Sequence, residues 1–411
     1  MKIKILGSGQ EVGRSAILLE SEKSVMMDFG VKIEPEPPQY PHAEKVDAAV
    51  ISHAHLDHIG ALPLLCKRSK PHIFMNDITL ELGVMLLKDS MKVGHIEGYD
   101  TPFGNKDMRK AIKNTKIVTQ RDKFKVGDTT FSLWPSGHIP GSSAILAEGR
   151  KRIFYTSDIQ TTDSRLLKKC QLPQNVDTLV IESTYGMRNR LPREQQEQLL
   201  IESVEEALSN DEVVLMPVFA VGRAQEVMMM LEKYASKIVM DGMARLASDI
   251  IADYSYYLRE PGRYKAMLKK IKFARTDEDR KKAVEKNSII ISSAGMLGGG
   301  PAVSYLRHIR GRENSKVIFS GFLVEDTPGR GLIETKIFKT AEEEFNVKCD
   351  LYQLELSGHA DRKGLMEIVK RTNPKQVICV HGDRCKDFAK DIEEHFGVQA
   401  FAPKNGEVIK I

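Results

Sequence analysis

The strongest constraint in this sequence is the run His53-Ala54-His55-Leu56-Asp57-His58, which directly follows the apolar segment Asp47 to Ser52. That segment is rich in alanine and β-branched residues and predicts a buried strand. Burying the imidazoles and the carboxylate of the run without partners would cost about 1–3 kcal/mol for each group, so the run is not a packed core. Two interpretations remain. One is a metal-binding turn, because zinc favours imidazole nitrogen and carboxylate oxygen; the other is a solvated histidine-rich loop.

Further acids and histidines follow other apolar segments, and they favour the metal-binding interpretation. In sheet proteins, ligand-binding side chains gather at strand ends, where a rigid scaffold holds the loops. A site for two metal ions needs about four protein ligands per ion, with the ions roughly 3.5–4 Å apart. The chain offers that number, with Asp158 as the natural bridging carboxylate. The strand-end residues outside the run are Asp28, His138, Asp158, His359 and His381.

Length and pattern predict two modules. A chain of 411 residues is longer than a single core usually supports. Closely spaced strand patterns before residue 160, with few helices between them, predict a sandwich of sheets. After Tyr185, short apolar strands at 213–217, 238–241 and 288–293 alternate with helices, which is typical of a parallel α/β module. The pattern of the first module returns with a strand expected at 352–356. We therefore expect the second module to be inserted into the first.

The N-terminal sequence, the apolar stretches and the cysteines indicate the cellular compartment. The N-terminus lacks the apolar run of a signal peptide, and no stretch reaches the roughly 18 apolar residues of a membrane span. The 5 cysteines form no paired CxxC motif, which fits a reducing setting. We therefore expect a cytoplasmic protein with no membrane partner. The net charge of +5 permits a polyanionic partner without arguing for one.

The histidine run belongs to a set of motifs that extends over nearly the whole chain. These are residues 7–15 (Gly-Ser-Gly-Gln-Glu-Val-Gly-Arg-Ser), 53–63, 181–186 (Ile-Glu-Ser-Thr-Tyr-Gly), 217–226 (Pro-Val-Phe-Ala-Val-Gly-Arg-Ala-Gln-Glu), 293–297 (Ser-Ala-Gly-Met-Leu), 357–361 (Ser-Gly-His-Ala-Asp) and 381–382 (His-Gly). Together they resemble the β-CASP family of the metallo-β-lactamase superfamily. The chain looks most like archaeal nucleases related to the cleavage and polyadenylation specificity factor or to ribonuclease J, without KH domains.

The resemblance implies a fold. It implies an α/β protein in which an αββα metallo-β-lactamase sandwich, formed by residues 1–186 and 351–411, carries an inserted α/β β-CASP domain at residues 187–350.

The resemblance also implies a site with two zinc ions. One zinc ion would be held by His53, His55 and His138, the other by Asp57, His58 and His381, and Asp158 would bridge them. Asp28 would orient a ligand histidine. Glu182 and His359 would form an acid–base pair, and Asp57 would count with them as catalytic. Other roles stay open: His381 without a metal contact, His359 as an extra ligand, and Glu182 paired with a backbone amide.

The resulting hypothesis is a zinc-dependent ribonuclease. Its substrate would be single-stranded RNA, cleaved endonucleolytically, 5′→3′ exonucleolytically or both, in RNA processing, 3′-end formation or decay. His381 supports RNA, because a histidine at this motif resembles the RNA-processing group of the family. The alternatives are a catalytically silent RNA-binding scaffold, a DNA nuclease of the same superfamily and a small-molecule hydrolase. A homodimer and an RNA-processing or decay complex are further expectations.

The inserted module offers candidate contacts for RNA phosphates at its glycine turns and helix starts. Such turns are also commonly plain connectors. Phe219 could stack a base, although we expect it to be a core residue. The candidates are Arg223, Ser292, Ser293, Gly295, Thr327 and Arg330.

Overall fold

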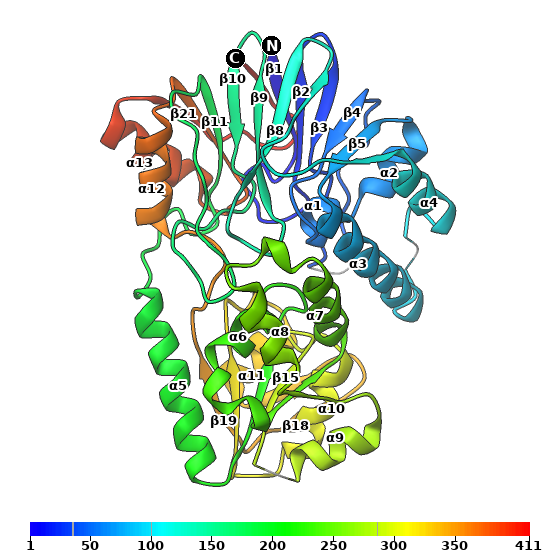
Figure 1. Cartoon of the computed structure of the whole chain (residues 1–411), viewed down its shortest axis with the longest axis vertical. Helices are drawn as coiled ribbons and strands as arrows, with labels where there is room; N and C mark the ends of the chain where they lie inside the picture. The colour runs from blue at the N-terminus through cyan, green and yellow to red at the C-terminus, as the bar shows by residue number, and fades with distance from the viewer. Residues whose placement is uncertain (35–36, 100, 286) are drawn as a thin grey trace. The chain divides into compact units, whose positions relative to one another are not determined.

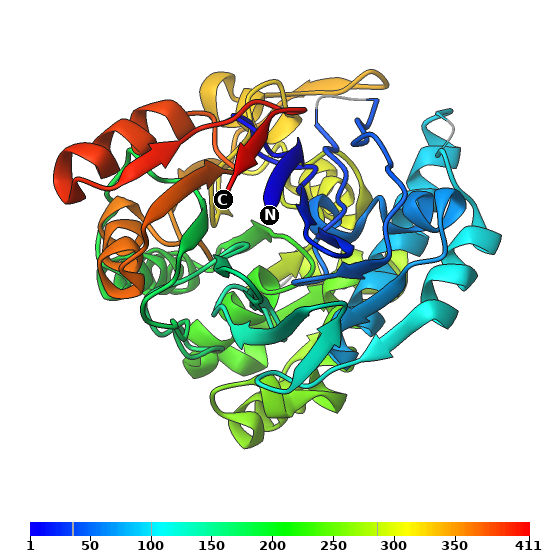
Figure 2. The same ribbon diagram turned by 90° about the horizontal axis from the view of Figure 1, so that it is seen from above.

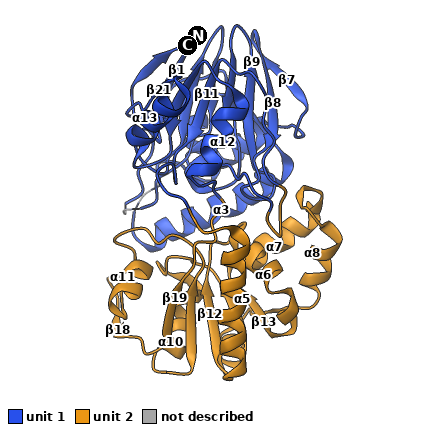
Figure 3. Cartoon of the chain, turned by 90° about the vertical axis from the view of Figure 1, so that its left-hand side faces the viewer, with its two compact units in different colours: residues 1–163, 169–189, 359–411 blue, residues 164–168, 190–358 orange. Residues whose placement is uncertain are grey.

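The computed structural model describes residues 1–34, 37–99, 101–285 and 287–411 (Figure 1). The chain divides into two compact units (Figure 3). The first comprises Met1–Asp163, Lys169–Asn189 and His359–Ile411, and the second comprises Ser164–Lys168 and Arg190–Gly358. The first unit thus contains chain segments that precede and follow the second unit in the sequence.

The first unit is a sandwich of two seven-stranded sheets. Apolar side chains from both sheets, such as Ile3, Phe131 and Ile378, form the core between them. The last strand pairs with the first, so the two chain ends lie side by side (Figure 2). One sheet has the order β22 (Val408–Lys410), β1 (Lys2–Gly7), β2 (Ala16–Glu20), β3 (Ser24–Met27), β4 (Ala48–Val50), β5 (His72–Met75), β6 (Thr115–Ile117); the other has the order β21 (Gln399–Phe401), β20 (Gln376–Val380), β11 (Thr178–Glu182), β10 (Arg152–Tyr155), β9 (Ser143–Glu148), β8 (Thr129–Pro135), β7 (Lys123–Val126).

Helices cover the outer face of each sheet, which gives the layers helix, sheet, sheet, helix (Figure 1). On one side Leu62 packs with Ile73 of the sheet, and on the other Leu365 packs with Leu179. The predicted α/β fold with an αββα sandwich is therefore confirmed. The helices are α1 (Leu56–Ile59), α2 (Leu62–Arg68), α3 (Asp77–Ile96) and α4 (Asn105–Asn114) on the first side, and α12 (Arg362–Thr372) and α13 (Cys385–Phe396) on the second.

The second unit is built on a six-stranded sheet whose pairings are parallel. Its central strands are fully buried and mostly apolar, as expected when helices cover both faces of a sheet. The strand order is β14 (Lys272–Phe273), β13 (Ile238–Asp241), β15 (Ile289–Ser292), β12 (Val213–Pro217), β16 (Ser315–Phe319), β19 (Asp350–Gln353), with a separate hairpin of β17 (Ile337–Lys339) and β18 (Glu344–Asn346). The helices are α5 (Arg193–Ser209), α6 (Arg223–Met230), α7 (Met243–Asp253), α8 (Pro261–Leu268), α9 (Asp277–Val284), α10 (Gly300–Ile309) and α11 (Pro328–Thr335), with short 3-10 helices at Glu232–Lys237 and Ser255–Tyr257. Among the helices described here, none is long and apolar enough to cross a membrane.

Strand β19 differs from the expectation. The sequence predicts a strand at 352–356 in the first module, but the structure forms it at Asp350–Gln353 and pairs it with β16 of the second unit. It is an edge strand with mostly exposed side chains, and so short a pattern does not reveal which sheet it joins. The second unit accordingly extends to Gly358 rather than to residue 350.

Candidate metal centre

The candidate ligands lie in loops that follow the carboxyl ends of strands in the first unit. Strands β3 and β4 are parallel neighbours in one sheet, and β10, β11 and β20 are parallel neighbours in the other. Their ends are therefore brought to the same edge of the sandwich. They deliver Asp28 after β3, His53 after β4, Asp158 after β10, Glu182 at the end of β11 and His381 directly after β20.

The predicted ligand residues come together in two groups that share Asp158. In each group the ligand atoms lie within 4.8 Å of one another. The first group is His53, His55, His138 and Asp158; the second is Asp57, His58, Asp158 and His381.

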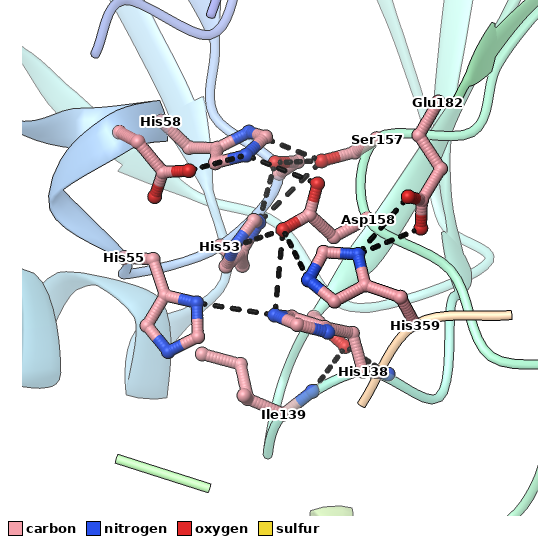
Figure 4. A network of polar contacts seen from close by, with 12 residues as sticks. His53, His55, His58, His138, Ile139, Ser157, Asp158, Glu182 and His359 are labelled. Carbon is pink, nitrogen blue, oxygen red and sulfur yellow. Dashed lines mark hydrogen bonds and ion pairs between the residues drawn. The ribbon is translucent and has the colours of Figure 1, made fainter. Parts of the chain in front are cut away.

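The two oxygens of Asp158 divide between these groups. Oδ2 lies 3.7 Å from His53 Nε2 and 3.4 Å from His138 Nε2. Oδ1 lies 3.2 Å from His58 Nε2 and 3.6 Å from His381 Nδ1. Figure 4 shows one oxygen of the carboxylate facing His58 and the other facing His53 and His138. One carboxylate facing two clusters of nitrogen ligands is the arrangement that a bridging ligand requires.

The residues present fit a bound cation. His53, His58 and Asp158 are at most 2% exposed. Nevertheless His53 Nε2, His58 Nε2 and Asp158 Oδ1 have no hydrogen-bond partner in the described part of the chain. Leaving buried polar atoms unsatisfied costs about 1–3 kcal/mol each. A metal ion between imidazole nitrogens and carboxylate oxygens would satisfy all three atoms.

Charge coupling in the cluster is strong. Burial lowers the pKa of His58, but Asp158, Asp57 and Asp28 outweigh burial and hold that pKa well above its usual range. Burial raises the pKa of Asp158, but His58, His381 and His359 outweigh burial and hold it well below its usual range. Asp158 is therefore ionised at neutral pH, and a proton on His58 balances charge that a cation would otherwise balance.

Asp28 is the centre of the hydrogen bonds that orient His58. It is fully buried, accepts hydrogen bonds from Ser52 N (2.7 Å), Ser52 Oγ (2.8 Å) and Tyr155 OH (3.0 Å), and lies 2.8 Å from His58 Nδ1. With Nδ1 engaged in this way, His58 presents Nε2 to Asp158. The histidine that Asp28 contacts in this way is His58.

Hydroxyl groups complete the surroundings of the ligands, and sequence reasoning missed them. Ser52 Oγ lies 3.0 Å from His53 Nδ1, Ser157 Oγ lies 3.3 Å from His58 Nδ1, and Thr184 Oγ1 lies 3.2 Å from His381 Nδ1. Each is next to, or within three positions of, a candidate residue in sequence. That adjacency was the available signal, but serine and threonine are too common near strand ends for it to stand out.

Glu182 and His359 are hydrogen-bond partners. Both carboxylate oxygens of Glu182 lie 3.0 Å from His359 Nδ1. Glu182 is 1% exposed and also accepts a hydrogen bond from Ile159 N. His359 Nε2 then lies 3.8 Å from Asp158 Oδ2, at the border of the ligand cluster (Figure 4).

In the second unit, four of the candidate RNA contacts lie at the carboxyl ends of the adjacent strands β12 and β15. Arg223 donates from Nη1 to Ser320 O (3.2 Å). Ser292 ends β15 and is buried, and Ser293 Oγ accepts a hydrogen bond from Met243 N. Gly295 packs so closely that a Cβ there would lie 3.0 Å from Val218 C.

The other two candidates have local roles at the start of α11. The Thr327 hydroxyl accepts from Arg330 N and donates to Val324 O (2.6 Å), and the Arg330 side chain pairs with Glu334 (2.6 Å). These contacts cap and support the helix. The expectation that Phe219 is a core residue is wrong, because it is 51% exposed.

Together, the layered sandwich and the shared imidazole–carboxylate cluster define a metallo-hydrolase. Three family models match the chain: the Zn-dependent metallo-hydrolase RNA specificity domain at residues 344–403, the Beta-Casp domain at 224–332 and the anti-Pycsar protein Apyc1 at 1–202.

Relatives of known name cover the whole chain. A "Probable RNase MJ4" of Methanocaldococcus jannaschii is 36% identical over all of both chains. An "RNase aCSPSF2" of Saccharolobus solfataricus is 33% identical over the whole chain and 85% of the relative, and the "Transcription termination factor FttA" of Thermococcus kodakarensis is 34% identical over the whole chain and 71% of the relative. A crystal structure of a protein of unknown function from Enterococcus faecalis shares the fold, with a TM-score of 0.61 at 17% identity over 100% of this chain and 99% of that one. The chain belongs to the β-CASP family of the metallo-β-lactamase superfamily.

Proposed function

We propose that the chain is a ribonuclease that uses two zinc ions to hydrolyse phosphodiester bonds in single-stranded RNA. The observation that carries the proposal is Asp158, whose two oxygens each face a separate group of imidazoles. RNA as the substrate is supported by relatives named as RNases and by the match to an RNA specificity domain, which includes His359 and His381.

The two ligand groups would each hold one ion. His53, His55 and His138 would bind the first, and Asp57, His58 and His381 the second, with Asp158 shared. When bound, such ions supply an activated water at neutral pH and neutralise charge on the phosphate. The chain's own contribution is to fix the ligand atoms through Asp28 and the surrounding hydroxyls.

Glu182 and His359 would move the proton. Glu182 accepts the Nδ1 hydrogen of His359, which fixes the ring so that Nε2 faces Asp158. When protonated, His359 would donate from Nε2 to the leaving 3′-oxygen. A positioned acid or base of this kind contributes about 10²–10⁴-fold to the rate.

The second unit would contribute RNA contacts. Arg223, Ser292, Ser293 and Gly295 are the stronger candidates, because they share one edge of a parallel sheet, where ligands commonly bind. Thr327 and Arg330 are weaker, because both already stabilise α11.

The proposal is tested with Asp57→Ala combined with His58→Ala. We expect this variant to fold, as seen by circular dichroism, and to lose cleavage of labelled single-stranded RNA. Cleavage at the wild-type rate would refute the mechanism. The silent-scaffold alternative predicts that the wild-type chain binds the RNA without cutting it, and a DNA nuclease would prefer DNA of the same sequence.

A second substrate set separates the two modes of cleavage. Circular RNA has no ends, so its cleavage would establish endonuclease activity. Faster loss of 5′-monophosphate RNA than of 5′-triphosphate RNA would establish a 5′ exonuclease.

We further propose a cytoplasmic setting and a place in RNA processing or decay. The 5 cysteines are all free thiols, which fits a reducing compartment, and one relative is named a transcription termination factor. A homodimer is tested by light scattering of the purified chain.

A further inference from the structure

The loop between β1 and β2 has a strained backbone. Ser8, Gln10 and Arg14 have positive φ angles of 62°, 57° and 40°. A left-handed conformation costs roughly 1–2 kcal/mol for residues other than glycine. Strain of this kind persists where the surrounding structure fixes it, and it often lies at functional sites.

Backbone hydrogen bonds join this loop to both chain segments that carry the second ligand group. Ser8 O accepts a hydrogen bond from His381 N (2.7 Å), and Glu11 O accepts one from Gly382 N (3.1 Å). Ser15 N donates to Asp57 O (2.7 Å). The loop therefore sets the separation of two ligands that lie more than three hundred residues apart in the chain.

The side chain of Glu11 clamps the loop. Its carboxylate accepts hydrogen bonds from Arg14 Nε (2.6 Å), Asn405 Nδ2 (2.6 Å) and Lys32 Nζ (3.3 Å). Asn405 Oδ1 in turn accepts from Gly9 N (2.8 Å). Burial raises the pKa of Glu11, but the hydrogen bonds from Arg14 and Asn405 outweigh burial and lower it, so the clamp is ionised at neutral pH.

The first ligand group is supported by different residues. Gln120 Nε2 donates to Ser142 O (3.1 Å) and Ser143 Oγ (3.0 Å), and Asn76 Nδ2 donates to Gly141 O (2.5 Å). These contacts hold the loop that carries His138. Each ligand group thus has a loop support of its own.

We propose that Glu11 is a positioning residue for the second metal site, holding the 8–15 loop so that Asp57 and His381 face one ion together. This inference rests on the two-zinc site of the proposed function. Residues that orient metal ligands typically change metal affinity by about 10–100-fold when they are replaced.

The test is a zinc titration of the metal-free, full-length chain without RNA. Glu11→Gln keeps the shape of the side chain and removes its charge. We expect the wild type to bind two zinc ions, and the variant to bind the first unchanged and the second about tenfold or more weakly. The matched control is Glu44→Gln, which breaks an ion pair with Lys4 on the same sheet and should titrate like the wild type. Equal weakening of both ions, or a titration like that of Glu44→Gln, would overturn the proposal.

Asn405→Ala is a second, milder variant, which tests the clamp even if Glu11→Gln does not fold. It removes one of three donors to Glu11 and leaves Arg14 and Lys32 in place. We expect a smaller loss, again confined to the second ion, in a chain that circular dichroism shows to be folded. An unchanged titration would refute the clamp. A wild-type chain that binds one ion would refute the two-zinc premise, whereas absent RNA cleavage by a chain that binds two would refute only the ribonuclease proposal.

Discussion

Each unit of this protein buries an aspartate at the carboxyl end of a strand, and the two aspartates have different partners. Asp158 of the first unit and Asp241 of the second are both 2% exposed. Asp158 faces imidazoles, and its Oδ1 has no hydrogen-bond partner among the described residues. Asp241 accepts hydrogen bonds from Arg280 Nε (2.7 Å) and Tyr305 OH (3.0 Å).

The difference shows what makes a buried acid a metal ligand. A guanidinium is always charged and saturates the carboxylate permanently. An imidazole can give up its proton and then bind a cation itself. A strand-end aspartate is therefore a candidate ligand only when its partners can become neutral. By this criterion the first unit holds the metal site, and Asp241 stabilises the second unit.

The largest effect is expected from Asp158→Asn. The change removes the charge that serves both ligand groups, so both zinc ions should be lost. Metal ions supply several kcal/mol of transition-state stabilisation, so we expect cleavage to fall by roughly 10⁴-fold or more. Zinc content and the rate of RNA cleavage are measured together. Asp241→Asn is the matched control, and an equal loss of zinc there would show that the two acids do not differ.

The strand pattern by itself does not distinguish the candidate aspartate Asp28 from Asp241. The chain reads Val-Met-Met-Asp at Asp28 and Ile-Val-Met-Asp at Asp241, yet Asp28 contacts His58 and Asp241 pairs with an arginine. The histidines were recognisable because few roles suit so many imidazoles at strand ends. Arg280 lies 39 residues beyond Asp241 on a charged helix, so only the folded chain reveals the pairing. The fold class followed from strand spacing and motifs, whereas the sheet joined by β19 depends on tertiary packing.

The next effect is on the stability of the second unit. Arg280→Ala would leave Asp241 buried with its charge uncompensated, which should lower the free energy of unfolding by about 3–5 kcal/mol. Urea unfolding at pH 7 measures this loss. Arg263→Ala is the control, because Arg263 pairs with Glu232 and Glu260 near the surface and should cost about 0–1 kcal/mol. A similar loss in both variants would contradict a special role for the buried pair.

A smaller effect with a pH signature is expected at Glu226. This buried acid accepts hydrogen bonds from Arg165 N (2.9 Å) and Leu166 N (2.8 Å), and it pairs with Arg193. Burial raises its pKa, but Arg193 and these amides outweigh burial and lower it.

The sign of the pH dependence follows from that lowered pKa. A carboxylate whose folded pKa lies below its unfolded value of about 4.3 stabilises the fold above that pH, and the benefit is lost as pH falls through the folded pKa. We expect Glu226→Gln to be about 2 kcal/mol less stable at pH 7, and the gap to narrow below about pH 4. Urea midpoints at pH 7, 5 and 3.5 measure the gap. A constant gap would mean that the charge of Glu226 is not what stabilises the fold.

The smallest expected effect concerns RNA binding by the second unit. Phe219 follows β12 and is 51% exposed, so Phe219→Ala should change the free energy of unfolding by no more than about 0.5 kcal/mol. If the ring stacks on a base, its loss should cost about 1 kcal/mol of binding, or roughly fivefold in Kd. Fluorescence anisotropy with a short labelled RNA and metal-free protein measures this without cleavage. Tyr256→Ala removes a ring of the same unit that is 61% exposed, and it should leave Kd unchanged. Equal effects from both changes would assign Phe219 no specific contact, and RNA recognition would then depend on the polar groups at the ends of β12 and β15.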